Sequence, residues 1–107
     1  MAQWIQAVPL QELKAGAPKI LQTEEGRIAL YKIEGQENGI YAILDVCTHD
    51  DGPLAEGLVE GCAIECPRHG AKFDLRTGAV VCMPAVTPIR TFPVRVNGQN
   101  IEVQVSG

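Results

Sequence analysis

Two short segments of the chain combine a cysteine with a histidine, side-chain types that readily bind transition metals. One residue separates Cys47 from His49, and two residues separate Cys66 from His69. Sixteen residues lie between His49 and Cys66. The chain has only two histidines, and both stand beside a cysteine. Two thiolates and two imidazoles on two loops predict a four-ligand metal site.

Three interpretations of this pattern compete. The four residues could be unconnected, although the pairing of both histidines with cysteines argues against it. Structural zinc also accepts two cysteines and two histidines, but zinc modules usually pair cysteines with each other at short spacing. An iron–sulfur cluster in which two histidines replace two cysteines on one iron fits the mixed pairs best.

Length and charge narrow the classes of protein. The 107 residues suit one domain, 46% are hydrophobic and 21% are charged, as in an ordinary globular protein. We therefore expect residues 1–107 to form a single domain. The formal net charge is −4, and the nine basic residues are scattered from Lys14 to Arg95. A nucleic-acid binder usually needs a concentrated basic surface, whereas this surface suits docking to a basic protein.

The chain carries no pattern that predicts export or membrane insertion. Its first residues lack a basic start followed by an apolar run, and no apolar stretch approaches the ~18 residues of a membrane span. We expect a cytoplasmic protein that is not attached to a membrane. In a reducing compartment disulfides are rare, which favours metal binding for cysteines that pattern with histidine.

Short strands must position the site. Residues 27–33 and 40–44, both rich in Ile, Leu, Ala and Tyr, lie on either side of 35–39, a segment rich in turn-forming residues, and together they predict a hairpin. Residues 91–96 predict a later strand. A single helical turn is expected within residues 9–14.

The C-terminal residues predict a second hairpin. Asn97 and Gly98 form a strong turn dipeptide, and beyond it Ile101, Val103 and Val105 alternate with polar residues, as in a half-buried strand. The pattern is all-β, a small antiparallel sandwich or barrel. Residues 46–88, rich in Gly, Pro and Cys, are expected to project from it as loops and short strands.

The two metal-binding segments resemble the cluster loops of Rieske proteins. Cys47-Thr48-His49 looks like the first loop of that family, and the segment from Cys66 to Gly70 looks like the second. The likeness continues through residues 73–78, similar to the strand and turn after the second loop, and residues 82–85, similar to a proline-bearing loop that covers the cluster. It spans essentially the whole chain and is greatest to the small ferredoxins that serve non-haem iron oxygenases.

The resemblance implies one [2Fe–2S] cluster and a role for each ligand. Cys47 and Cys66 would hold the inner iron, and His49 and His69 the outer one. Two ferric ions, two sulfides and two thiolates sum to zero charge, so reduction gives −1. An all-cysteine cluster would go from −2 to −3, and neutral imidazoles therefore raise the potential.

The surrounding residues predict a potential at the low end of the Rieske range, about −150 to +300 mV. The positions of an additional loop disulfide in high-potential relatives are Gly52 and Arg68 here, so that disulfide cannot form. The positions of their serine and tyrosine hydroxyls are Ala71 and Phe73, which donate no side-chain hydrogen bond.

Nearby charges act in both directions. Asp50 and Asp51 disfavour an added electron, whereas Arg68 and Lys72 favour it. Cys62 and Cys82 are expected to be buried small apolar residues and not ligands.

The resemblance implies a one-electron carrier that takes electrons from a flavin-containing reductase and passes them to a non-haem iron oxygenase. Weak, transient docking of a monomer is expected. The chain lacks histidines for a second, catalytic iron and a Gly-rich nucleotide motif, so a stand-alone enzyme is not expected. Two alternatives stay open: an accessory subunit of a larger reductase or a carrier for iron–sulfur assembly, and a zinc-stabilised interaction module.

Overall fold

The computed structural model describes residues 2–15, 17–33, 39–46, 54–55, 57–67, 70–82 and 87–106. Its regular structure consists of antiparallel strands and one short 3₁₀ helix, η1, at Leu10–Glu12. The all-β class is therefore confirmed, as is the single helical turn expected after Pro9. Within these ranges, no helix is long and apolar enough to cross a membrane.

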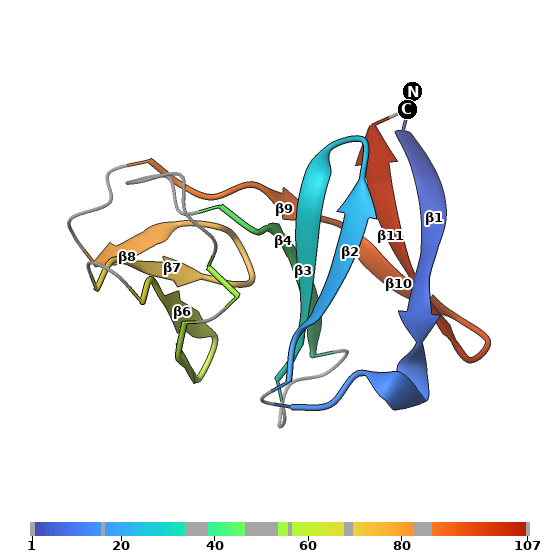
Figure 1. The fold of residues 1–107 in the computed structure, drawn as a ribbon, viewed down its shortest axis with the longest axis horizontal. Helices are drawn as coiled ribbons and strands as arrows, with labels where there is room; N and C mark the ends of the chain where they lie inside the picture. Colours follow the sequence, from blue (N-terminus) through green and yellow to red (C-terminus); the bar gives the residue numbers. More distant parts are fainter. Residues whose placement is uncertain are drawn as a thin grey trace.

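Two sheets form the base of the molecule (Figure 1). The first has the order β1-β11-β10, with β1 at Ala2–Pro9, β11 at Asn100–Ser106 and β10 at Val94–Asn97. The second has the order β2-β3-β4-β9, with bounds Lys19–Thr23, Gly26–Lys32, Ile40–Leu44 and Thr91–Phe92. Pairing of β1 with β11 brings the two ends of the chain together (Figure 1).

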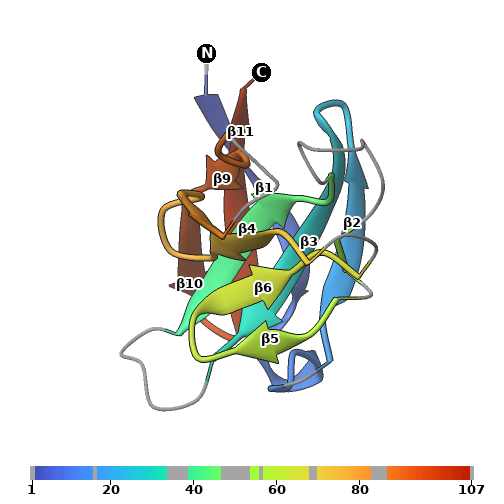
Figure 2. The same ribbon diagram turned by 90° about the vertical axis from the view of Figure 1, so that its left-hand side faces the viewer.

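A third sheet forms a separate lobe, which Figure 2 shows in front of the base. Its order is β5-β6-β7-β8, with bounds Val59–Glu60, Ala63–Glu65, Lys72–Asp74 and Val80–Cys82. In sequence it lies between β4 and β9, which are themselves paired. The lobe therefore leaves the base at β4 and returns to it at the neighbouring strand β9.

Strand β3 is buried on both faces, because it lies between two hydrophobic cores. Ile28 and Leu30 pack with Ile101 and Val103 of β11 in the core between the base sheets. Ala29 and Tyr31 point the other way, and they belong to the core beneath the third sheet. This position explains the apolar run 28–31 of β3, because a strand that is covered on both faces does not alternate between apolar and polar residues.

The two predicted hairpins are present. Strands β3 and β4 pair antiparallel from Ile28↔Leu44 to Lys32↔Ile40, and the amide of Ile33 donates to the carbonyl of Gly39 at 2.6 Å. The residues of this turn from 34 to 38 lie outside the described residues.

The C-terminal turn forms at the Asn97-Gly98 dipeptide, as predicted. Asn97 pairs with Asn100 across it, and Gly98 adopts φ 65°, a conformation that glycine tolerates well. Beyond it, Ile101, Val103 and Val105 are buried, while the residues between them are half-buried. The predicted alternation of β11 is confirmed.

The prediction of one strand over residues 91–96 is wrong. Pro93 divides it into β9, which pairs with β4, and β10, which pairs with β11, so that the halves belong to different sheets. Proline has no N–H to donate to a ladder, but the carbonyl of Pro93 accepts the amide of Gln104 at 2.9 Å.

Candidate metal centre

The second predicted ligand loop forms the tip of the β6–β7 hairpin. Glu65 pairs with Lys72 at the end of the ladder. Beyond that pair, the amide of Cys66 donates to the carbonyl of Ala71 at 2.6 Å, and the amide of Gly70 donates to the carbonyl of Cys66 at 3.1 Å. Gly70 has φ 76°, a conformation that glycine tolerates well in a tight turn. The loop is therefore closed by two main-chain hydrogen bonds, with Cys66 at its root.

Cys66 is the predicted ligand that the structure describes most fully. It is 1% exposed, and it belongs to the same core as Ala71, Phe73 and Leu54. It is a free cysteine. A thiol held in an apolar core at the root of a loop fits the ligand of an inner, buried iron.

The first ligand loop is defined by its two ends. Residues 47–53, which include Cys47 and His49, lie outside the described residues, and so does His69. Leu54, the first described residue after the loop, is fully buried in the core that contains Cys66. The end of the first loop and the root of the second therefore meet in one core, which fits a cluster held by both loops.

The described residues alone do not assemble a metal site. Among them, no group of three or more histidine, cysteine, aspartate or glutamate side chains could hold an ion. Three of the four predicted ligands lie outside the described ranges, so the ligand set stays a prediction.

Asp45, an acidic residue near the site, was not predicted from the sequence to have a role. The carboxylate of Asp45 is fully buried, and its Oδ1 accepts the amides of Leu54 at 2.7 Å and Ala55 at 2.8 Å. Its Oδ2 lies 3.2 Å from Nη2 of Arg27. The only signal in the sequence was an acidic residue at the end of an apolar strand, just before a cysteine.

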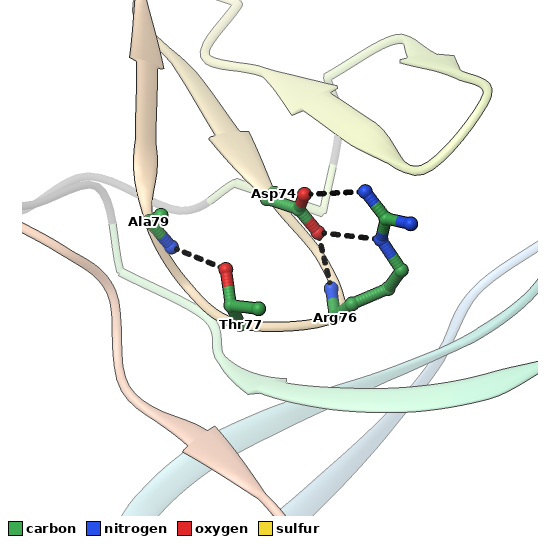
Figure 3. Close-up of polar contacts among 4 residues, drawn as sticks. All are labelled: Asp74, Arg76, Thr77 and Ala79. Carbon is green, nitrogen blue, oxygen red and sulfur yellow. Dashed lines mark hydrogen bonds and ion pairs between the residues drawn. The ribbon is translucent and has the colours of Figure 1, made fainter.

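A tight turn after β7 carries a network of side-chain hydrogen bonds (Figure 3). Oδ1 of Asp74 accepts the amide of Arg76 at 2.7 Å and its Nε at 3.1 Å, and Oδ2 accepts Nη2 at 2.9 Å. The amide of Ala79 donates to Oγ1 of Thr77 at 3.2 Å. The side-chain hydrogen bonds from Arg76 hold the pKa of Asp74 below its usual value. This turn fixes the direction in which the chain leaves the second loop.

The chain then returns toward the site along β8. Lys72 pairs with Cys82 and Phe73 with Val80, with a register shift between them. Cys82 therefore lies across the ladder from Lys72, the first residue of β7 after the second loop. The side chain of Cys82 and residues 83–86, where the covering loop was predicted, are outside the described part.

The residues predicted to tune the site have different environments. Ala71 and Phe73 are completely buried in the core that contains Cys66, and neither side chain can donate a hydrogen bond. Nζ of Lys72 lies 3.8 Å from Oε1 of Glu65, so the carboxylate of Glu65 partly balances the positive charge of Lys72. Asp50, Asp51, Gly52 and Arg68 are outside the described residues.

The prediction that Cys62 is buried is wrong, because it is partly exposed. Its carbonyl accepts the amide of Leu75 at 2.7 Å, which places this residue of the β5–β6 turn beside the end of β7. Tyr31 is a core residue. Trp4 lies on β1, where the guanidinium carbon of Arg95 is 4.2 Å from its ring centroid.

Known proteins match the chain over nearly its full length. The Rieske [2Fe-2S] domain family matches residues 3–93. The chain therefore belongs to the Rieske [2Fe–2S] family, and its cofactor is one [2Fe–2S] cluster.

The relatives specify the type of Rieske protein. The ferredoxin component of a naphthalene 1,2-dioxygenase system of Pseudomonas aeruginosa is 38% identical over 97% of both chains. The ferredoxin of carbazole 1,9a-dioxygenase from Nocardioides aromaticivorans IC177 aligns with TM-score 0.84 and 31% identity, over 94% of this chain and 95% of its own. The chain is thus an electron-carrying ferredoxin and not a catalytic component.

A third relative shows such a ferredoxin with its partner. A structure of reduced oxygenase in complex with oxidised ferredoxin, from carbazole 1,9a-dioxygenase, contains a chain of 30% identity and TM-score 0.84. The alignment covers 94% of this chain and 91% of that one.

Proposed function

We propose that this ferredoxin serves a multicomponent non-haem iron dioxygenase. It accepts one electron from a flavin-containing reductase and passes it to a terminal oxygenase. The observation that carries the proposal is the full-length match to ferredoxin components of aromatic dioxygenase systems. The alignment covers 97% of this chain and 97% of that relative.

The proposed cluster ligands are Cys47, His49, Cys66 and His69. The cysteines bind the inner iron and the histidines the outer one. The burial of Cys66 supports its inner position. When bound, the cluster supplies one reversible electron, and the chain supplies its position, its potential and a docking surface.

The proposed reduction potential is in the lower half of the Rieske range. Ala71 and Phe73 are buried beside Cys66 and offer no side-chain donor, and such donors would favour the reduced, more negative cluster. A potentiometric titration monitored by the visible spectrum tests this. A value above about +100 mV would place the protein with high-potential members of the range instead.

The proposed working form is a cytoplasmic monomer, one domain over residues 1–107, that docks transiently with each partner and does not attach to membranes. Transient electron-transfer complexes bury little surface and separate quickly. The net charge of −4 favours partners with basic docking surfaces.

Rapid mixing with a reductase and an oxygenase tests this function. The ferredoxin, reduced by NADH through the reductase component of a naphthalene 1,2-dioxygenase system, should be reoxidised when the oxygenase component is added. His69→Ala protein is the matched control, which should carry no electrons. A stable complex with a reductase subunit during purification from its native host, without electron delivery to an oxygenase, would refute the proposal in favour of an accessory subunit.

A further inference from the structure

Asp45 joins the two ends of the segment that carries the first ligand pair. It lies two residues before Cys47, at the end of β4. Its Oδ1 accepts the amides of Leu54 and Ala55, the first residues described after the loop, at 2.7 and 2.8 Å. One oxygen atom therefore bridges the start of the loop and its end.

The base sheet fixes Asp45 itself. Its amide donates to the carbonyl of Arg27 on β3 at 2.8 Å, which extends the β3–β4 ladder by one residue. The amide of Val46 donates to the carbonyl of Leu44 at 2.8 Å. The carboxylate is thus anchored to a strand that is buried on both faces.

The far end of the bridge is equally well anchored. Leu54 is fully buried in the core that contains Cys66, and its carbonyl accepts the amide of Gly57 at 2.8 Å. Gly57 packs so closely that a Cβ there would lie 1.8 Å from the carbonyl oxygen of Glu65, on the strand that leads to Cys66. The position of Leu54 relative to Cys66 is therefore fixed by both side-chain and main-chain contacts.

The arrangement requires an acceptor at residue 45 more than it requires a charge. Without Oδ1 the amide of Leu54 would be buried and unpaired, at a cost comparable to a lost hydrogen bond. Arg27, by contrast, has a side chain that is 47% exposed, so water screens the arginine end of its ion pair with the buried Oδ2. The substitution Asp45→Asn retains the acceptor oxygen and removes the charge. A mutation can therefore separate the hydrogen-bonding role of Asp45 from the role of its charge.

We propose that Asp45 is a positioning residue for the cluster: it ties both ends of the segment that carries the proposed ligands Cys47 and His49 to the core that contains Cys66. The inference rests on the proposed ligand assignment, but the bridge itself does not depend on that assignment.

Three variants test the proposal: Asp45→Ala, Asp45→Asn and Arg27→Gln. Each is assayed for iron and sulfide per chain, for the EPR signal and potential after reduction, and for hydrogen exchange of the peptide that contains Leu54 and Ala55. Asp45→Ala should exchange those amides about tenfold faster, the effect of losing hydrogen bonds worth ~1.4 kcal/mol. It should hold less than half of the wild-type iron, with an altered EPR signal.

Asp45→Asn should keep the protected amides, the iron content and the EPR signal, and its potential should move upward because a buried negative charge is removed. Arg27→Gln should load its cluster normally. If Asp45→Ala is not obtained as folded protein, Asp45→Asn decides: protected amides and full loading support the bridge, and their loss overturns it.

Two further results would overturn the inference. One is an Asp45→Ala variant whose Leu54 and Ala55 amides exchange at the wild-type rate and whose EPR signal is unchanged. The other is loss of iron in Arg27→Gln equal to that in Asp45→Ala, which would make the ion pair the important contact. An error in the ligand assignment is recognised separately, because Cys47→Ser would then retain the normal cluster while the exchange results for Asp45 stand.

Discussion

Gly78 and Ile89 approach each other so closely that there is no room for a side chain between them. The amide of Ile89 donates to the carbonyl of Gly78 at 2.9 Å. A Cβ on Gly78 would lie 2.1 Å from the carbonyl oxygen of Ile89, and Gly78 has φ 81°. This contact joins the turn after β7 to the segment that returns to the base, and so it helps to hold the cluster lobe in place.

Gly78→Ala should therefore destabilise the protein strongly. Left-handed strain costs about 1–2 kcal/mol and the steric clash about 1–3 kcal/mol more. Gly98→Ala is the matched control, since Gly98 has φ 65° but open space around it, and only the strain of about 1–2 kcal/mol applies. Urea unfolding followed by circular dichroism compares the two variants. Equal losses of stability would show that Gly78 and Ile89 are not in close contact.

Tyr31→Phe should leave stability unchanged or raise it by up to about 1 kcal/mol at pH 8, because a buried hydroxyl without a partner costs free energy. The residue is 4% exposed, and its hydroxyl has no hydrogen-bond partner among the described residues. The measurement is the free energy of unfolding in urea. A loss above 1 kcal/mol would reveal a partner for this hydroxyl.

The same residue predicts a difference at alkaline pH. Burial, and to a lesser extent the charge of Asp45, raises the pKa of Tyr31 above the ordinary value near 10. The unfolded chain then releases this proton first, so wild-type stability is fully present below about pH 10 and is lost as pH rises above it. Tyr31→Phe should lose less stability than wild type between pH 9 and 11. Parallel curves for the two proteins would contradict the prediction.

The turn in Figure 3 predicts a difference at acid pH. Because the pKa of Asp74 is lowered in the folded protein, its contribution to stability is present above the unfolded value near 4 and is lost as pH falls below it. Asp74→Asn should be less stable than wild type at pH 7, by less than Gly78→Ala, and the gap should narrow toward pH 3. Unfolding in urea at both pH values measures it. A gap that stays constant would show that ionisation of Asp74 is irrelevant.

His69→Ala should abolish the Rieske EPR signal or prevent assembly of the cluster, because the outer iron would lack a ligand. Arg68→Ala is the matched control in the same loop. It should keep the signal and lower the potential slightly, since a positive charge is removed. An unchanged spectrum and potential in His69→Ala would refute its assignment as a ligand.

Much of the fold was predictable because it depends on local patterns. The alternation of Ile101, Val103 and Val105 and the Asn97-Gly98 turn are short-range signals, and both are confirmed. The all-β class follows from such segments. By contrast, the division at Pro93 depends on which sheet each half joins, and that choice depends on long-range pairing.

The sequence predicted the cofactor of the site better than the contacts that hold its loops in place. The family resemblance implied the [2Fe–2S] cofactor, and the structure adds that Cys66 is buried and that Gly70 has a positive φ. Asp45 was missed because its partners, the amides of Leu54 and Ala55, are main-chain groups that leave no mark on the sequence. Burial of Cys62 failed as a prediction because apolar character alone does not say which face of a turn a residue occupies.

The most direct test of the account is EPR spectroscopy of the anaerobically purified protein after reduction with dithionite, with iron and acid-labile sulfide counted on the same sample. We predict a rhombic Rieske signal with two irons and two sulfides per chain. A protein that contains zinc, or no metal after an attempt to reconstitute the cluster with iron and sulfide, and that gives no signal, would contradict the assignment of Cys47, His49, Cys66 and His69 as ligands of a [2Fe–2S] cluster.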